Sequence, residues 1–219
     1  MAVRSVTGDL RRDSLGQVLP HEHLLIDYGQ MAGRAAPVDD DTRQRCEQVL
    51  HELHRLGVGT VVECTPPGYG RDIGLLQDLS RLSGVQIIAS TGSFCEQWHT
   101  QPTVIATATV GDLASRFTAE LQKPAAGCGV IKAATSHGRI TPNEEKLLLA
   151  AAAAHRKTRA PIVSHTTDGL GLEQLDLYAD EGVDISAVLI STVCSGTEPA
   201  AYAIEIDQRG AMVDRERMG

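Results

Sequence analysis

The sequence predicts an α/β fold in which strands alternate with helices around a parallel sheet. Three observations support this prediction. Short apolar runs bounded by glycine and proline alternate with longer stretches of helical composition, which is the pattern of βα units. The apolar runs are continuous, as in strands that are buried on both faces. Aromatic residues make up only 3% of the chain, so small aliphatic side chains must fill the core, which favours helices packed closely on strands.

Seven short apolar segments are predicted as strands. In chain order they are residues 17–23, 59–65, 85–91, 127–135, 160–166, 186–192 and 210–215. Six longer segments between or after them are predicted as helices. These are residues 39–57, 70–84, 110–122, 141–158, 171–182 and 198–210. The first helix opens on acidic residues and closes on Gly57, and the fourth has Thr141 as a cap and Pro142 in its first turn.

Length, charge and cysteine content narrow the class of protein. The 219 residues are expected to form a single domain over residues 1–219. A net charge of -8 disfavours nucleic acid as a partner and favours a small-molecule substrate. No run approaches the ~18 apolar residues of a membrane span, and the N-terminus lacks the apolar segment of a secretory signal, so the cytoplasm is expected. Five scattered cysteines without a CxxC pair indicate reduced thiols.

Residues able to bind a metal ion collect at the carboxyl ends of the predicted strands. His21 and His23 end the first strand, Glu63 lies near the end of the second, Lys132 lies within the fourth, and His165 lies near the end of the fifth. Sites in parallel α/β proteins form at this end, so these residues are expected to meet. Because side chains alternate along a strand, both histidines of the His-Glu-His run can reach one ion. Neutral imidazoles suit zinc and similar divalent ions.

Each of these residues also has a structural interpretation. Two histidines two residues apart occur by chance on surfaces and in cores, and His165 alone would fit a hydrogen-bonded core histidine. Lys132 can extend its amine past the strand end. A lysine inside an apolar strand otherwise carries a desolvation cost unless it is paired, neutralised or chemically modified. Taken together, the three strand ends favour a metal site.

Five motifs follow one another along the chain: GDLRRDSLGQVLPHEHLLID, VVECTPPGYGRDIGLL, IIASTGSF, GVIKAATS and PIVSHTT. In this order and spacing they resemble the phosphotriesterase family of the amidohydrolase superfamily, which includes phosphotriesterases, phosphotriesterase-like lactonases and phosphotriesterase homology proteins. The resemblance implies a TIM barrel with a two-metal site. It implies that His21 and His23 hold the first ion, that Lys132 bridges both ions as a carbamate formed with carbon dioxide, and that His165 binds the second. It assigns residues 70–72 to loop structure.

The sequence departs from the family pattern in two places. The family's sixth strand ends in Gly-His, where this chain has Ser191 and Thr192, and the family's eighth strand supplies an aspartate that lies beyond the last predicted strand here. The predicted fold class is therefore α/β, a truncated or incomplete TIM-type (β/α) barrel lacking the last βα unit or units. Open strand edges are a liability, so a homo-oligomer is expected to cover the open barrel edge.

These departures predict one divalent ion, zinc, rather than two, with no other cofactor. Cys194 is a candidate replacement ligand, and a buried structural thiol is its alternative interpretation. Glu63, Cys64 and Asp168 are further candidates for that place. Asp168 and Glu63 are also the candidates for a catalytic carboxylate, although Asp168 equally fits a loop or cap residue. The loop that carries Trp98 either lines the site or packs on the surface.

The function expected from this reasoning is that of a divergent metal-dependent hydrolase of an ester, lactone or phosphoester. The alternative is a catalytically altered or inactive family member that serves a binding or structural role or performs a non-hydrolytic reaction. A third interpretation is that the chain is a fragment of a longer gene product.

Overall fold

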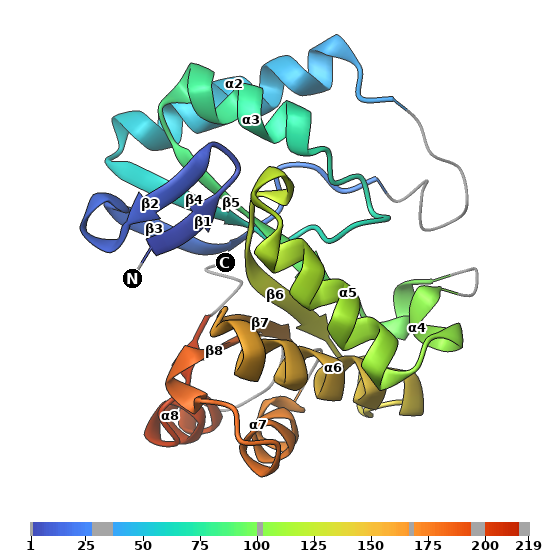
Figure 1. Ribbon diagram of the computed structural model, residues 1–219. Helices are drawn as coiled ribbons and strands as arrows, with labels where there is room; N and C mark the ends of the chain where they lie inside the picture. The colour runs from blue at the N-terminus through green and yellow to red at the C-terminus, as the bar shows by residue number, and fades with distance from the viewer. Residues whose placement is uncertain (1, 28–36, 100–102, 167–168, 194–199, 215–219) are drawn as a thin grey trace. The chain divides into compact units, whose positions relative to one another are not determined.

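The computed structural model describes residues 2–27, 37–99, 103–166, 169–193 and 200–214 (Figure 1). These residues form an α/β fold with one seven-stranded sheet and one two-stranded sheet. The large sheet has the strand order β3-β4-β5-β6-β7-β8-β9, so neighbours in the sheet are neighbours along the chain, and the registered pairs are parallel. This strand succession is that of an incomplete TIM barrel and confirms the predicted fold class.

The predicted strands and helices are all present. The strands of the large sheet are β3 (Gln17–Glu22), β4 (Val58–Glu63), β5 (Gln86–Gly92), β6 (Cys128–Ala134), β7 (Ile162–His165), β8 (Val188–Ser191) and β9 (Met212–Val213). The α-helices are α2 (Asp40–Arg55), α3 (Ile73–Ser83), α4 (Val104–Thr107), α5 (Val110–Gln122), α6 (Pro142–Thr158), α7 (Gly171–Asp180) and α8 (Ala200–Gln208). Within the described ranges, none of the helices combines the length and apolar character that crossing a membrane requires.

Some boundaries differ from the predicted ones. The helix expected to begin at residue 70 begins at Ile73, because Asp72 is its N-cap and accepts a hydrogen bond from the Leu75 amide. The strand expected over residues 210–215 is reduced to the two residues of β9. The short helix α4 and the 3-10 turns were not predicted from the sequence. These turns are η1 (Arg12–Ser14), η2 (Glu96–Trp98), η3 (Pro124–Ala126) and η4 (Ile185–Ala187).

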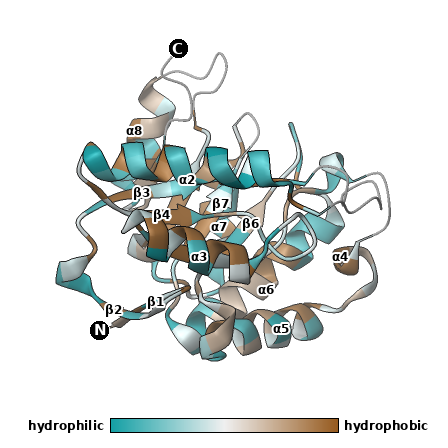
Figure 2. Ribbon diagram, turned by 90° about the horizontal axis from the view of Figure 1, so that it is seen from above, coloured by the Kyte–Doolittle hydropathy of each residue, from teal (hydrophilic) through white to brown (hydrophobic). Residues whose placement is uncertain are grey.

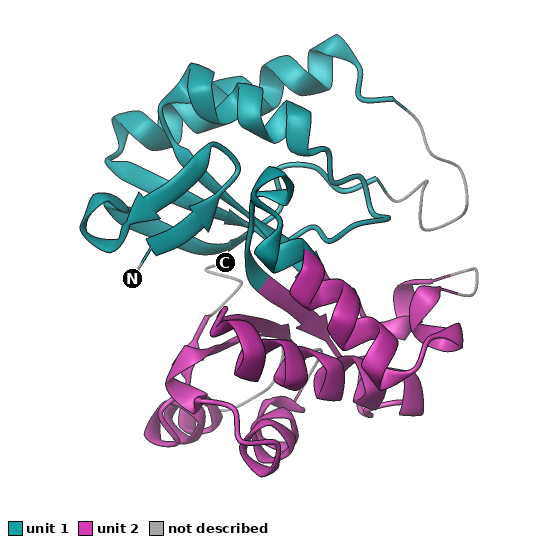
Figure 3. Ribbon diagram, viewed as in Figure 1, with its two compact units in different colours: residues 1–91, 120–130 teal, residues 92–119, 131–219 magenta. Residues whose placement is uncertain are grey.

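The chain divides into two compact units (Figure 3). Unit 1 holds residues 1–91 and 120–130, and unit 2 holds residues 92–119 and 131–219. Strand β6 begins in unit 1 and continues into unit 2, so both units contain part of the large sheet. The expectation of one domain over residues 1–219 stays a prediction.

In unit 1, β3 is the first strand of the sheet order and carries a proline. Pro20 has no N–H to donate, which is tolerated on an edge strand. The register between β3 and β4 shifts between Leu19 and Glu22, on either side of this proline. The irregularity falls just before the end of β3, where His21 and His23 lie.

An antiparallel hairpin, β1 (Ala2–Ser5) with β2 (Gly8–Arg11), precedes β3 and was not predicted. Its residues are exposed or half-buried except Ser5, so the strands lack the continuous apolar run that identifies a buried strand. Tertiary contacts hold the hairpin in place. The Val6 amide donates to the carbonyl of Ile87 (2.9 Å), and the Gln77 side chain donates to the carbonyl of Val6 (2.9 Å).

Helices α2 and α3 lie side by side in unit 1 (Figure 1). Helix α2 begins after Asp39, whose carboxylate accepts a hydrogen bond from the Thr42 amide (2.7 Å). Its side chains are mostly polar, and Figure 2 shows the helix largely in teal. Its buried residues are Cys46 and Leu50, so α2 is amphipathic.

The Gly-Arg-Asp segment at residues 70–72 has a structural role in unit 1, as expected for a loop. Arg71 is nearly buried, and its Nη1 donates to the carbonyl of Ser90 (2.6 Å), to Glu120 Oε2 (3.1 Å) and to Cys128 Sγ (3.0 Å). The guanidinium therefore joins the loop after β4 to β5, to the end of α5 and to the start of β6. Burial is the main cause that raises the pKa of Cys128 to about 11.

In unit 2, the alanine-rich helix α6 packs closely because its side chains are small. Most of its buried residues are alanines or leucines, and strands β6, β7 and β8 contribute fully buried isoleucines. The helix starts at a capping box: Thr141 Oγ1 accepts from the Glu144 amide (3.2 Å), and Glu144 Oε2 accepts from the Thr141 amide (3.0 Å). Thr141 and Pro142 therefore act as the sequence predicted.

Candidate functional site

The two histidines of the His-Glu-His run lie at the end of β3 in unit 1. His21 is the buried residue before the end of the strand, and His23 directly follows it. Their rings are neighbours, with centroids 5.2 Å apart and an interplanar angle of 73°. Glu22 between them is exposed. The alternation along the strand therefore brings the two imidazoles together, as expected from their spacing.

Glu63, the last residue of β4, is buried beside His23 with only 1% of its surface exposed. Its Oε1 accepts the Thr65 hydroxyl proton (2.6 Å) and the Leu24 amide (3.3 Å), and its Oε2 accepts the Thr65 amide (3.2 Å). The Nδ1 atom of His23 forms a hydrogen bond with Thr65 Oγ1 (2.9 Å) and lies 3.9 Å from Glu63 Oε1. Thr65 thus connects the carboxylate to the imidazole.

The environment of Glu63 brings its carboxyl into the range used for acid–base chemistry. Burial raises the pKa of Glu63 from 4.5 to about 7, and the hydrogen bonds from Thr65 and Leu24 oppose this rise. A general base near neutral pKa is well matched to proton transfer at physiological pH. Glu63 is therefore suited by its surroundings to the catalytic carboxylate role considered for it.

In unit 2, Lys132 lies within β6 and is 1% exposed. The backbone around it is tightly packed: its carbonyl accepts a hydrogen bond from the Ser93 amide (3.1 Å), and a Cβ added at Gly92 would lie 1.8 Å from the same oxygen. A buried primary amine is costly as a cation, and conversion to an anionic carbamate would turn it into a metal ligand. The burial of Lys132 therefore fits the role that the family resemblance implies for it.

His165 ends β7 in unit 2 and is 8% exposed. Its Nδ1 forms a hydrogen bond with Thr192 Oγ1 (2.8 Å), and its ring lies 5.3 Å from that of Trp98 in an edge-to-face arrangement. Trp98 also contacts Phe94, with centroids 5.6 Å apart. The loop after β5 therefore packs its tryptophan against the histidine, while Trp98 stays 40% exposed.

Thr192, which stands where the resemblance places a histidine, has a left-handed backbone with φ 66°. A β-branched residue in this region is strained, and such strain is concentrated at functional positions. Its hydroxyl contacts a candidate ligand, His165, instead of providing a nitrogen donor. From the sequence, Thr192 is only a missing ligand and Thr65 has no predicted role, because neither contact has a local sequence signal.

Three candidates for a ligand or a base remain. Asp168 and Cys194 lie outside the described residues. Cys64 is fully buried, with its thiol 4.0 Å from the carbonyl of Pro20. Among the residues that the structure describes, no three His, Cys, Asp or Glu side chains are grouped so that they could hold a metal ion.

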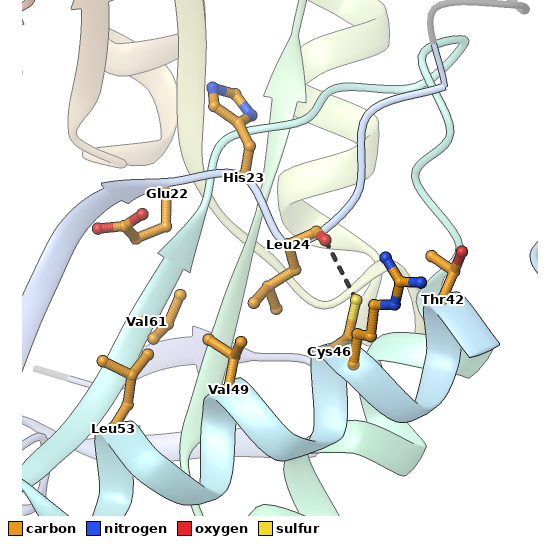
Figure 4. Close-up of a pocket in the computed structure, with 9 residues that line it drawn as sticks. Glu22, His23, Leu24, Thr42, Cys46, Val49, Leu53 and Val61 are labelled. Atoms are coloured by element: carbon orange, nitrogen blue, oxygen red, sulfur yellow. Dashed lines mark hydrogen bonds between the residues drawn. The ribbon is translucent and has the colours of Figure 1, made fainter.

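A pocket of about 320 Å³ lies in unit 1 between α2 and the strands β3 and β4 (Figure 4). Apolar side chains dominate its lining, and Glu22 and His23 from the end of β3 also border it. Cys46 of α2 donates its thiol proton to the carbonyl of Leu24 (3.2 Å), which closes one side. In Figure 4 the imidazole of His23 points away from Val49 and Leu53. The pocket therefore touches the ring pair through His23, while its apolar lining comes from α2 and β4 and from Leu24.

Comparison with known proteins identifies the family. The family model described as "Phosphotriesterase family" matches residues 1–219. The phosphotriesterase homology protein of Escherichia coli (strain K12) is 33% identical over 213 residues, covering 94% of this chain and 72% of that protein. The aryldialkylphosphatase of Saccharolobus solfataricus is 27% identical over 215 residues, covering 94% of this chain and 67% of that protein.

Comparison with solved structures gives the same family. A double mutant of the organophosphorus hydrolase from Deinococcus radiodurans superposes with a TM-score of 0.88 at 31% identity, covering 97% of this chain and 67% of that chain. The shared fold, the family match over every residue and the identity above 30% lead to one conclusion. This chain belongs to the phosphotriesterase family of hydrolases.

Proposed function

We propose that the protein is a divalent-metal-dependent hydrolase of an ester, lactone or phosphoester, with zinc held by His21, His23, Lys132 and His165. The observation that carries the proposal is the pair of imidazoles at the end of β3, with ring centroids 5.2 Å apart. Two neighbouring neutral nitrogen donors suit zinc. The relatives named as an aryldialkylphosphatase and an organophosphorus hydrolase support the reaction class.

The residues assigned to the ion fit its chemistry. Lys132 is buried and would be a costly cation there, whereas a carbamate on its Nζ would offer anionic oxygens to the metal. A bound divalent ion would polarise the carbonyl or phosphoryl group of the substrate and lower the pKa of a bound water. Glu63 or Asp168 would then accept the proton. The chain itself supplies the donors and the base.

The proposal assigns one ion rather than two. The support is Thr192, whose hydroxyl contacts His165 at the place where the family resemblance expects a histidine ligand. A threonine hydroxyl is a poor ligand for zinc, which prefers nitrogen, thiolate and carboxylate donors. Replacing Thr192 with histidine would raise the zinc stoichiometry towards two per chain if this assignment is right.

Metal content and turnover test the proposal together. The full chain is purified, supplied with zinc and ¹³C-bicarbonate, and measured by elemental analysis and by ¹³C NMR for the carbamate carbon. One zinc per chain and a carbamate signal that Lys132→Ala removes are expected. His21→Asn and His23→Asn should lose the zinc. His51→Asn is the matched control, because His51 lies on α2 with half of its side chain exposed. A wild-type chain without stoichiometric zinc and without carbamate contradicts the proposal.

Substrate assays complete the test. A panel of lactones, aryl esters and phosphotriesters should show turnover that falls with the zinc content of the variants. Zinc binding without turnover on any member would favour the alternative function, a family member that binds its ligand or performs a non-hydrolytic reaction. The observation that favours this alternative is the replacement of an expected ligand by Thr192.

We also propose that the protein is a cytoplasmic homo-oligomer. Strands β3 and β9 stand at the two ends of the sheet order, and edge strands present backbone groups that a second copy can cover. Met212 of β9 and Ile204 of α8 are each about half exposed, which supports an apolar contact there. The four described cysteines are buried thiols, in keeping with a reducing compartment. Light scattering at micromolar concentration should give a mass above that of one chain, and a monomer would contradict the proposal.

A further inference from the structure

Helix α6 holds the connection between β5 and α5 in unit 2. The described parts of this connection are residues 93–99, which include η2, and residues 103–109, which include α4. Glu96 opens η2, and its carboxylate accepts hydrogen bonds from the hydroxyl of Thr141 (2.6 Å) and from Nδ2 of Asn143 (2.6 Å). Thr141 caps α6 and Asn143 lies in its first turn, so the start of this helix binds η2 directly.

Glu144, in the same first turn, is fully buried and binds η2 a second time. Its Oε1 accepts hydrogen bonds from the Glu96 amide (2.8 Å) and from the hydroxyl of Ser136, which follows β6. The Ser136 oxygen in turn accepts a hydrogen bond from the Gln97 amide (3.1 Å). Two successive backbone amides of η2 therefore end on buried side chains, where removing the acceptor would leave a donor unsatisfied.

Lys146 binds the other described part of the connection. Its Nζ donates to the carbonyls of Ile105 (2.7 Å), Ala106 (3.4 Å) and Ala108 (3.3 Å), at the C-terminal end of α4. The last carbonyls of a helix have no partner within it, so a lysine amine satisfies them. Helix α4 lies beside α6 (Figure 1). Both described parts of the connection are thus tied to one short stretch at the start of α6.

The cap of α6 explains only part of the bonding of Glu144. A capping box needs one carboxylate oxygen, here Oε2, which accepts from the Thr141 amide (3.0 Å). The other oxygen serves Glu96 and Ser136, which belong to other segments. A glutamine at this position would keep only one acceptor oxygen. It could therefore serve the cap or η2, but not both.

Trp98 is the side chain that η2 positions. It is the last residue of η2, and its ring contacts those of Phe94 (5.6 Å between centroids) and His165 (5.3 Å). The two residues before it carry the bound amides, so the backbone that sets the direction of the indole is fixed from α6 and from the segment after β6. Holding this ring therefore also holds one side of the His165 imidazole.

We propose that Glu144 is a positioning residue that fixes η2 and so holds the Trp98 ring against His165. The loop after β5 is then a preformed wall beside this histidine, in place before any ligand arrives. Support of this kind keeps a binding site in its productive geometry. The part of the inference that concerns His165 as a metal ligand rests on the proposed function, whereas the part that concerns Trp98 is a property of the metal-free chain.

Intrinsic fluorescence tests the inference, because Trp98 is the only tryptophan of the chain. Emission spectra and acrylamide quenching are measured on the metal-free protein. Trp98 is 40% exposed in the fold, so Glu144→Gln should shift its emission to longer wavelength and raise its quenching constant towards that of the urea-unfolded chain. Glu145→Gln is the matched control: it removes the neighbouring carboxylate of the same turn, which is exposed, and should leave both readouts unchanged.

Amide hydrogen exchange gives a second readout that does not depend on fluorescence. In the wild-type chain the amides of Glu96 and Gln97 should be protected, although they lie outside the α-helices and strands. Glu144→Gln should lose this protection and Glu145→Gln should keep it. Asn143→Ala removes one donor to the Glu96 carboxylate and leaves Glu144 intact, so it should change the fluorescence in the same direction by less.

Rapid exchange of the two amides in the wild-type chain, or a folded Glu144→Gln variant with unchanged fluorescence, would overturn the inference. If Glu144→Gln does not fold, the wild-type exchange and the fluorescence of Asn143→Ala decide. In the zinc-loaded enzyme, turnover should fall with the change in fluorescence in Glu144→Gln and not in Glu145→Gln. If fluorescence and exchange are as expected but the wild-type chain binds no zinc, the proposed function fails and the positioning of Trp98 stands.

Discussion

Replacing Arg71 with methionine should destabilise the protein far more than replacing a surface arginine. The side chain of Arg71 is 10% exposed, and its guanidinium donates to three acceptors: the carbonyl of Ser90, the carboxylate of Glu120 and the thiol of Cys128. Methionine keeps the apolar stem but removes the charge and every donor. Glu120, whose side chain is 20% exposed, would then keep its charge without its partner.

The size of the effect follows from this burial. Removing one partner of a fully buried ion pair costs about 3–5 kcal/mol, and the partial exposure of Glu120 places Arg71→Met near the lower end, at about 3 kcal/mol. For a chain of this length each kcal/mol lowers the melting temperature by about 2–4 °C, so a fall of roughly 6–12 °C is expected. Arg43→Met is the control: its pair with Asp78 (2.8 Å) is about half exposed at both side chains and should contribute about 0.2–1 kcal/mol.

Thermal and urea unfolding followed by circular dichroism measure both variants. In the double variant, Arg71→Met with Glu120→Gln, the free energy of unfolding should fall by less than the sum of the two single decreases. The reason is that the second substitution removes the charge left without a partner in the partly buried site. Equal losses for Arg71→Met and Arg43→Met, within about 0.5 kcal/mol, would refute the view that Arg71 is a buried anchor of unit 1.

Three further predictions test the packing of the two units. In urea unfolding, Gly92→Ala should lower the free energy of unfolding by roughly 1–3 kcal/mol more than Gly138→Ala. Both glycines have positive φ, but only at Gly92 would an added Cβ press onto the Lys132 carbonyl. Equal decreases would contradict this packing. By the same measurement, Thr141→Ala should lower the free energy of unfolding by about 1 kcal/mol and Thr141→Ser by much less, because the cap of α6 needs a hydroxyl. An equal decrease for Thr141→Ser would argue against the cap. The described thiols should resist alkylation at pH 8 in the native protein and react once it is unfolded, because burial protects them and raises the pKa of several; mass spectrometry of labelled peptides would show any exception. These thiols are Cys46, Cys64, Cys95 and Cys128.

The candidate site was partly predictable from local patterns. The alternation of a strand places His21 and His23 on one side, and their rings do lie together. Lys132 stood out because a charged residue interrupted an apolar strand, and the structure buries it almost completely. Thr65 had no such signal. It is 42 residues from His23 along the chain, and an ordinary threonine at a strand end indicates nothing about the ring it will meet.

The sequence by itself determined the α/β class, the order of the strands and helices, and the family, because apolar periodicity, caps and motifs are local and survive without knowledge of tertiary contacts. The tertiary structure decided which distant groups meet: the hairpin held by Ile87 and Gln77, the three acceptors around Arg71, and the hydroxyl between Glu63 and His23. These contacts depend on the register and direction of side chains from separate segments. A hydrogen bond requires two atoms at about 3 Å, and only the folded chain brings them that close.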